Sequence, residues 1–96
     1  MKIDTKIAGS ILSLKIEGQI TGIMEVQSIK SNIENNLENA NEIKLILKDA
    51  YVMPSSLIGY LVKLVRGDEK TVVIEAKTEL KNLLSDLDLK HVFTIR

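Results

Sequence analysis

The central stretch Asn41-Glu-Ile-Lys-Leu-Ile-Leu-Lys-Asp-Ala-Tyr-Val-Met-Pro-Ser-Ser-Leu-Ile-Gly59 joins an apolar run to the start of a helical pattern. Residues 43–47 are nearly all apolar, which is typical of a strand buried on both faces. After Pro54, the only proline, apolar residues recur at helical spacing until Gly67-Asp68 ends the pattern. They are Leu57, Ile58, Leu61, Val62, Leu64 and Val65. The stretch therefore predicts a buried strand followed by an amphipathic helix.

The chain continues on the carboxyl side with the same alternation of strand and helix. Residues 71–75, Thr-Val-Val-Ile-Glu, predict another buried strand. A third helix is indicated by Leu80, Leu83, Leu84 and Leu87, with Thr78 as the expected N-cap. Residues 91–95 predict a closing strand.

The amino-terminal side begins with two segments that alternate in period two. Residues 2–7 and 10–17 predict short strands joined by a tight turn at Gly9-Ser10. The loop 18–22 follows, with a glycine at each end. A helix is then expected from apolar residues spaced by three and four, with Thr21 as N-cap and a stop at Asn39 to Asn41. Its apolar residues are Ile23, Val26, Ile29, Ile33 and Leu37. Its acidic outer side is interpreted as a solvated face.

The predicted element order is β-β-α-β-α-β-α-β. Strands that alternate with helices form right-handed βαβ crossovers and become parallel neighbours in one sheet. The opening hairpin adds an antiparallel strand, so the expected fold is a single α/β domain over residues 1–96 with a mixed, mostly parallel sheet. No linker, repeat or low-complexity tract divides the 96 residues.

Composition excludes several classes of function. Thirteen basic residues balance thirteen acidic ones, so no global charge attracts nucleic acid. The chain has no cysteine and one histidine, which argues against thiolate or His-based metal sites and against a Ser/His/Asp relay. No segment has the apolar length of a membrane span or the apolar block of a signal peptide. We therefore expect a cytoplasmic protein without a cofactor, a metal or direct membrane insertion.

The segment from Asn41 to Gly59 resembles the central signature of STAS domains, the family of the anti-sigma factor antagonists. In that family a buried strand runs through an acidic residue and an apolar pair into Asp-Ser-Ser-Gly-Leu-Gly at a helix start. Asp49 matches the acidic residue, residues 52–53 match the apolar pair, Ser55 and Ser56 match the serines, and Gly59 matches the second glycine. The loop 17–20, the element order and the Leu-rich last helix extend the resemblance over essentially the whole chain.

Two positions depart from the family pattern. Pro54 stands where the family has Asp, and Leu57 stands where it has the first Gly. Pro54 fixes its own φ but offers no carboxylate beside the serines. Leu57 adds bulk where a glycine would allow a partner to approach closely.

The resemblance implies a regulatory binding module and no enzymatic activity. Unphosphorylated Ser55 binds a partner, and phosphorylation at Ser55, with Ser56 as the fallback, releases it. The implied partners are an anti-sigma factor or other serine kinase and a serine phosphatase. The implied partner-binding residues are Gly18, Gln19, Ile20, Pro54, Ser55, Ser56, Leu57, Gly59 and Tyr60. The sequence leaves the oligomeric state open.

The residues themselves also allow a purely structural role for Ser55. At a helix start its hydroxyl is a candidate N-cap, which contributes about 1 kcal/mol. The same helix end tolerates a phosphate, so capping and phosphorylation are compatible. Gly59 is expected to cost the second helix about 1 kcal/mol relative to Ala, offset by close packing on the sheet or by a flat surface for a partner. Tyr60 is either a surface anchor for a partner or half-buried core.

Two other functions remain as alternatives. Relatives with a STAS domain also act as non-catalytic subunits of a bacterial lipid-transport ABC system, and they relax the Asp-Ser-Ser-Gly motif. An enzyme is less well supported, because Ser55 has only His91 as a candidate base, and a structural role is the better interpretation of that histidine. Gly18 and Gly22 lack the spacing of a dinucleotide-binding loop and are interpreted as turn glycines.

Overall fold

The computed structural model describes residues 1–96 and contains five strands, three α-helices and two 3-10 turns. The strands are β1 (Lys2–Ala8), β2 (Ile11–Glu17), β3 (Glu42–Leu47), β4 (Thr71–Glu75) and β5 (Thr94–Ile95). The helices are α1 (Ile23–Glu34), α2 (Ser55–Arg66) and α3 (Thr78–Asp86), and the turns are η1 (Leu37–Asn39) and η2 (Leu89–His91). The predicted order of strands and helices is confirmed.

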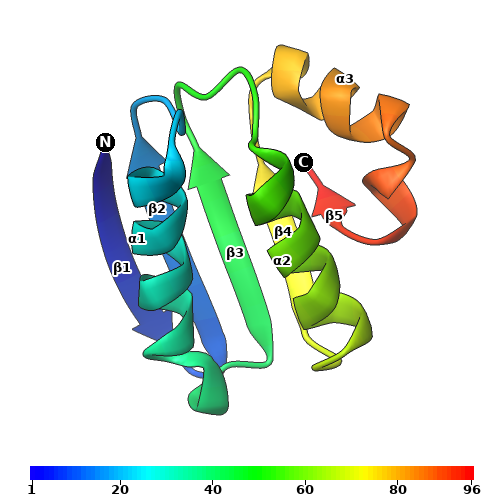
Figure 1. Cartoon of the computed structure of the whole chain (residues 1–96). Coiled ribbons are helices and arrows are strands. Elements are labelled where there is room, and N and C mark those ends of the chain that lie inside the picture. Colours follow the sequence, from blue (N-terminus) through cyan, green and yellow to red (C-terminus); the bar gives the residue numbers. More distant parts are fainter.

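The five strands form one mixed sheet in chain order, β1-β2-β3-β4-β5. β1 and β2 form the predicted antiparallel hairpin, whose turn uses Gly9 at a φ of +61°. β2, β3, β4 and β5 run parallel to one another, as Figure 1 shows. The prediction of a single α/β domain with a mixed, mostly parallel sheet is therefore confirmed.

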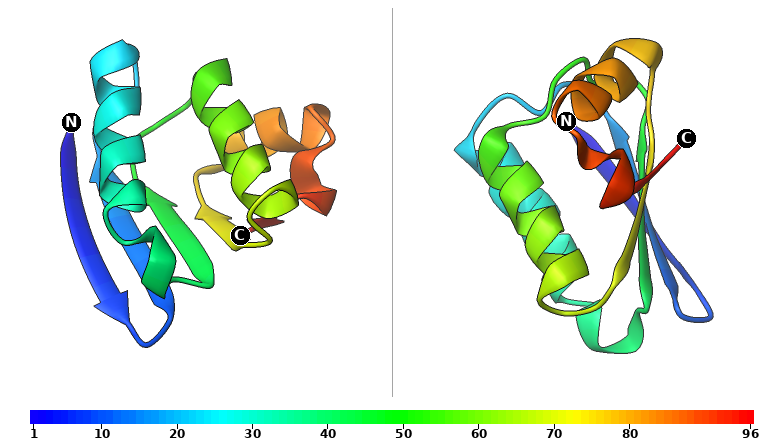
Figure 2. Two further views of the ribbon diagram at one scale, coloured as in Figure 1. Left: turned by 60° about the horizontal axis from the view of Figure 1, so that its bottom comes forward. Right: turned by 90° about the vertical axis from the view of Figure 1, so that its right-hand side faces the viewer.

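All three helices lie on one face of the sheet (Figure 2). The core consists of aliphatic side chains from this face and from the helices, with Phe93 as its only fully buried aromatic residue. The prediction that β3 is buried on both faces is wrong. Ile43, Leu45 and Leu47 are buried, whereas Lys44 and Ile46 point to the uncovered face and are half-buried. No helix in the structure combines the length and the apolar character needed to cross a membrane.

Several predicted element ends differ from the structure. Gly22 and Lys77, and not Thr21 and Thr78, are the N-cap residues of α1 and α3. The Thr21 hydroxyl instead donates a hydrogen bond of 3.2 Å to Glu25, one turn into the helix. α1 ends at Glu34, before the predicted stop, and η1 follows it. The last strand is shorter than predicted because η2 takes up the residues before Val92.

Helices α1 and α2 lie side by side (Figure 1). Tyr60 of α2 connects the two helices. The Tyr60 hydroxyl donates a hydrogen bond of 2.9 Å to the Glu34 carboxylate, and Lys30 Nζ lies 5.4 Å from the centre of the ring. Partial burial raises the pKa of Tyr60 above its usual range, and the hydrogen bond to Glu34 and the charges of Glu34 and Asp68 raise it further. The sequence allows Tyr60 to be either a surface anchor for a partner or half-buried core, and its position in the structure is half-buried.

We expect Tyr60 to make the protein less stable in alkali. Because its pKa is raised in the folded state, the unfolded chain loses the phenol proton first, and stability falls as the pH rises above about 10. Thermal unfolding of wild type and Tyr60→Phe between about pH 8.5 and 11 measures this effect. The melting temperature of wild type should fall more steeply than that of the variant. If the melting temperatures of the two proteins fell equally with pH, the result would contradict this role of Tyr60.

Candidate functional site

Three loops meet at the carboxyl-terminal edge of the parallel strands. They are residues 18–22 between β2 and α1, residues 48–54 between β3 and α2, and residues 76–77 between β4 and α3 (Figure 1). Because β2, β3 and β4 are parallel, the loops that follow them lie at one edge of the sheet. Most of the site residues predicted from the sequence belong to the first two loops and to the first turn of α2.

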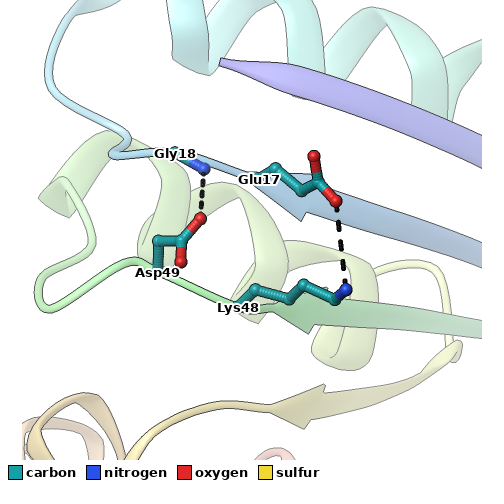
Figure 3. A network of polar contacts seen from close by, with 4 residues as sticks. All are labelled: Glu17, Gly18, Lys48 and Asp49. Carbon is teal, nitrogen blue, oxygen red and sulfur yellow. Dashed lines mark hydrogen bonds and ion pairs between the residues drawn. The ribbon is translucent and has the colours of Figure 1, made fainter.

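Asp49 ties the first loop to the second (Figure 3). Its carboxylate accepts a hydrogen bond of 3.0 Å from the Gly18 backbone N–H, and its backbone carbonyl accepts one from the Gln19 amide nitrogen. The Gln19 amide oxygen in turn accepts a bond of 3.3 Å from the Tyr51 N–H. Gly18 has a φ of +96°, a conformation that favours glycine. The acidic residue after the strand therefore has a structural role in fixing both loops.

An ion pair beside this contact adds little. Lys48 Nζ lies 3.9 Å from Glu17 Oε1, and both side chains are exposed (Figure 3). Exposed pairs of this kind contribute between about zero and 1 kcal/mol. The hydrogen bonds of Asp49 and Gln19 are therefore the main polar contacts between the two loops.

Four exposed apolar side chains belong to these loops or follow them directly in the chain. Ala50 and Met53 are buried and anchor the second loop to the core, so that Tyr51 and Val52 between them project outward, 53% and 54% exposed. Ile23 and Met24 at the start of α1 are 80% and 81% exposed. We call Ile23, Met24, Tyr51 and Val52 the apolar rim. Apolar groups gathered at one edge are typical of an interaction surface.

The apolar rim is the part of the site that sequence patterns did not predict. The spacing of Ile23 assigned it to the buried stripe of α1, but Ile23 is the first residue of the helix and its side chain is exposed. Tyr51 lies next to Lys77, whose Nζ is 5.9 Å from the centre of the ring. The sequence did contain a signal for this surface, because the apolar residues Tyr51 and Val52 lie close to Asp49 in the loop between β3 and α2.

Ser55 is the first residue of α2 and its side chain is exposed. The capping interpretation of Ser55 is wrong, because Pro54 is the N-cap and its carbonyl accepts the first helical bond, 3.1 Å from the Ile58 N–H. None of the side-chain hydrogen bonds of the structure involves the Ser55 hydroxyl. By their position in the first turn, the backbone N–H groups of Ser55 and Ser56 have no partner within the helix. The hydroxyl is therefore free at a positively polarised helix end.

Of the nine predicted partner-binding residues, Tyr60 is half-buried against α1. The structure separates the other eight into two groups. Gly18, Gln19, Pro54, Ser55, Ser56 and Gly59 have surface that a partner can reach. Ile20 and Leu57 are 1% and 0% exposed and belong to the core. Their side chains therefore hold the first loop and α2 against the sheet and offer no contact to a partner. The bulk that Leu57 adds relative to glycine points inward, away from any docking molecule.

Gly59 lies on the exposed side of α2, one turn after Ser55. A Cβ atom at this position would meet no heavy atom within 4 Å. Close packing on the sheet is therefore wrong as an explanation of this glycine. Together with Ser55 and Ser56 it leaves the outer side of the first two turns nearly flat.

Nothing in the structure connects His91 to Ser55. His91 is exposed in η2, and its Nε2 lies 3.9 Å from Asp88 Oδ1. A surface recess lies at the opposite edge of the sheet, lined by Glu34, Leu37, Glu38, Asp68 and Lys70. Lys70, the only amine among these residues, donates a hydrogen bond of 2.7 Å to the Ala40 carbonyl.

Neither a scan against protein-family models nor a search of curated proteins gives a match for this chain. Function is therefore inferred from the residues and their geometry. The features available for that inference are the free Ser55 hydroxyl, the flat start of α2 and the apolar rim.

Removing the Asp49 carboxylate should loosen the two loops. We expect Asp49→Ala to lower the free energy of unfolding by about 1 kcal/mol, because the Gly18 N–H loses its acceptor. Hydrogen exchange of the Gly18 amide should become faster. Asp49→Asn keeps an acceptor and serves as the matched control. Unchanged exchange at Gly18 in Asp49→Ala would contradict the role of this hydrogen bond.

Gly59→Ala should stabilise the protein. Since the added methyl group meets no neighbour and Ala favours the helix, the free energy of unfolding should rise by about 0.5–1 kcal/mol. Urea denaturation measures the change. A loss of stability would show that a neighbouring group limits the space at this position.

Proposed function

We propose that this chain is a STAS-like regulatory binding domain whose unphosphorylated form binds a partner and whose form phosphorylated at Ser55 does not. The observation that carries the proposal is the exposed Ser55 hydroxyl at the start of α2, three residues after Val52 of the apolar rim. The proposed partner is an anti-sigma factor or other serine kinase, and a serine phosphatase restores binding. The order of elements and the match from Asp49 to Gly59 support the resemblance on which the choice of partner rests.

Phosphorylation at Ser55 is compatible with the fold. A phosphate brings a charge of about −1.5 to −2. The N–H groups and dipole at the start of α2 interact favourably with that charge, by about 0.3–1 kcal/mol. No acidic side chain lies in the first turn of α2 to oppose it. The modification therefore leaves the domain folded.

The same modification opposes docking at this edge. A partner that covers the apolar rim and the flat start of α2 must remove water from Ser55. A phosphate there resists desolvation, and a loss of about 2.7 kcal/mol weakens binding a hundredfold. Pro54 supplies no carboxylate that would already place a negative charge beside the two serines.

The subunit of a lipid-transport ABC system is the second candidate. The apolar rim favours it, because permanent assemblies use more apolar surface than transient ones. That function has no need of a free serine. The two candidates therefore differ in their response to charge at position 55.

A capture experiment in the native host separates the two candidates. The tagged wild type, Ser55→Ala and Ser55→Asp are compared by mass spectrometry of co-purifying proteins and phosphosites. We expect wild type and Ser55→Ala to retain a serine kinase or related regulator that Ser55→Asp loses at least about tenfold, with phosphate on Ser55.

Two further variants make the result specific. Ser28→Asp places the same charge on an exposed serine of α1 and should retain the partner. Ser56→Asp tests the fallback position. Phosphate found on Ser56 alone would show that Ser56, and not Ser55, is the phosphorylated residue. Capture of the same ABC ATPase by every variant, with no phosphate at either serine, would contradict the switch.

A further inference from the structure

β1 is an edge strand whose free backbone groups can be identified. The Ser10 and Ile16 carbonyls accept hydrogen bonds of 2.8 and 3.3 Å from the Asn41 and Lys48 N–H groups. The even-numbered residues of β2 therefore direct their backbone N–H and C=O groups toward β3. Since backbone direction alternates along a strand, the odd residues of β2 face β1. Their register partners are Lys2, Asp4, Lys6 and Ala8. The polar backbone groups of the remaining β1 residues, Ile3, Thr5 and Ile7, therefore point away from the sheet.

We propose that two copies of this chain pair antiparallel through β1, with Thr5 opposite Thr5 on the two-fold axis. This register places Ile3 opposite Ile7 of the second copy and Ile7 opposite Ile3. All of these residues carry outward-facing N–H and C=O groups, so each opposed pair exchanges two hydrogen bonds. The two five-stranded sheets then form one continuous sheet, in which the β1 edge of each copy is paired and no longer free.

Charge complementarity selects this register. On the uncovered face of the sheet, Asp4 lies opposite Lys6 of the second copy, and Lys6 lies opposite Asp4. Within each chain Asp4 is also the register partner of Lys15. Charges of alternating sign therefore run across the junction. Opposed pairs of this kind stabilise a sheet, and like charges in the same place destabilise it.

The neighbouring registers that satisfy the backbone lack this complementarity. A shift of two residues in one direction places Asp4 opposite Asp4 and Lys2 opposite Lys6. A shift of two in the other direction places Lys6 opposite Lys6. Lysines on an edge strand commonly prevent such pairing, but the Asp between Lys2 and Lys6 makes this edge complementary to itself.

The helix-facing side of β1 adds apolar contact. Ile7 is 53% exposed, which is unusual for a side chain on the covered face. Ile3 is half-buried and packs against the core. Pairing places each Ile7 against Ile3 of the second copy, so the dimer covers an apolar residue that the single chain leaves in water.

Sedimentation analysis of charge variants tests the pairing. The wild type should sediment as a dimer of the 10.7 kDa chain in a concentration-dependent manner. Asp4→Lys and Lys6→Glu each create two like-charge pairs and should weaken dimerisation at least about tenfold. The double variant Asp4→Lys/Lys6→Glu restores opposite charges and should dimerise again. Circular dichroism checks that each variant is folded.

Three outcomes would overturn the proposal. They are a wild type that stays monomeric up to about 1 mM, single variants that dimerise like wild type, and a folded double variant that remains monomeric. The first excludes a dimer, and the other two place any contact outside this register.

Disulfide formation gives an independent test, because the chain contains no cysteine. Residues opposed in a hydrogen-bonded pair have Cα atoms about 5.5 Å apart, within the range of a disulfide. Thr5→Cys should therefore form covalent dimers under mild oxidation. Thr94→Cys, on the opposite edge strand β5, is the matched control and should not. Equal cross-linking of the two variants would overturn the pairing.

Discussion

The structure depends on the burial of one face of the sheet beneath the three helices. Leu14, Leu45 and Ile74 are register neighbours across β2, β3 and β4, and all three are 0% exposed. Burying each such side chain contributes about 1.5–3 kcal/mol. Because only three aromatic residues are present, this aliphatic layer and the helix residues above it provide nearly all of the core.

Parallel strands under parallel helices determine where the site lies. Each crossover returns the chain to the same edge, so the two loops joined by Asp49 and the start of α2 meet there. The buried residues Ile20 and Leu57 hold these segments from below. A chemical change at Ser55 therefore acts on the surface at this edge without passing through the core.

The other consequence of one-sided burial is a long free edge at β1. The two outer strands differ, since β1 has seven residues and β5 has two. A short edge offers little to a partner strand, whereas β1 offers three residues with outward backbone groups. The surface around Ser55, where we propose a switch, and the proposed pairing edge belong to different parts of the fold, and each proposal is tested without the other.

The sequence alone determined the order of the elements, the hairpin and the position of Ser55 at a helix start, because local periodicity and turn residues carry that information. Periodicity identifies a face but does not say whether another element covers it. Only the tertiary structure therefore decided that β3 is buried on one face and that Ile23 is exposed. It also decided that Pro54, and not Ser55, is the N-cap residue of α2, because the Pro54 carbonyl accepts the first helical hydrogen bond. The position at which a helix begins depends on how the preceding loop is anchored. The inward direction of Leu57 has the same origin, since the packing of α2 on the sheet fixes the rotation of the helix.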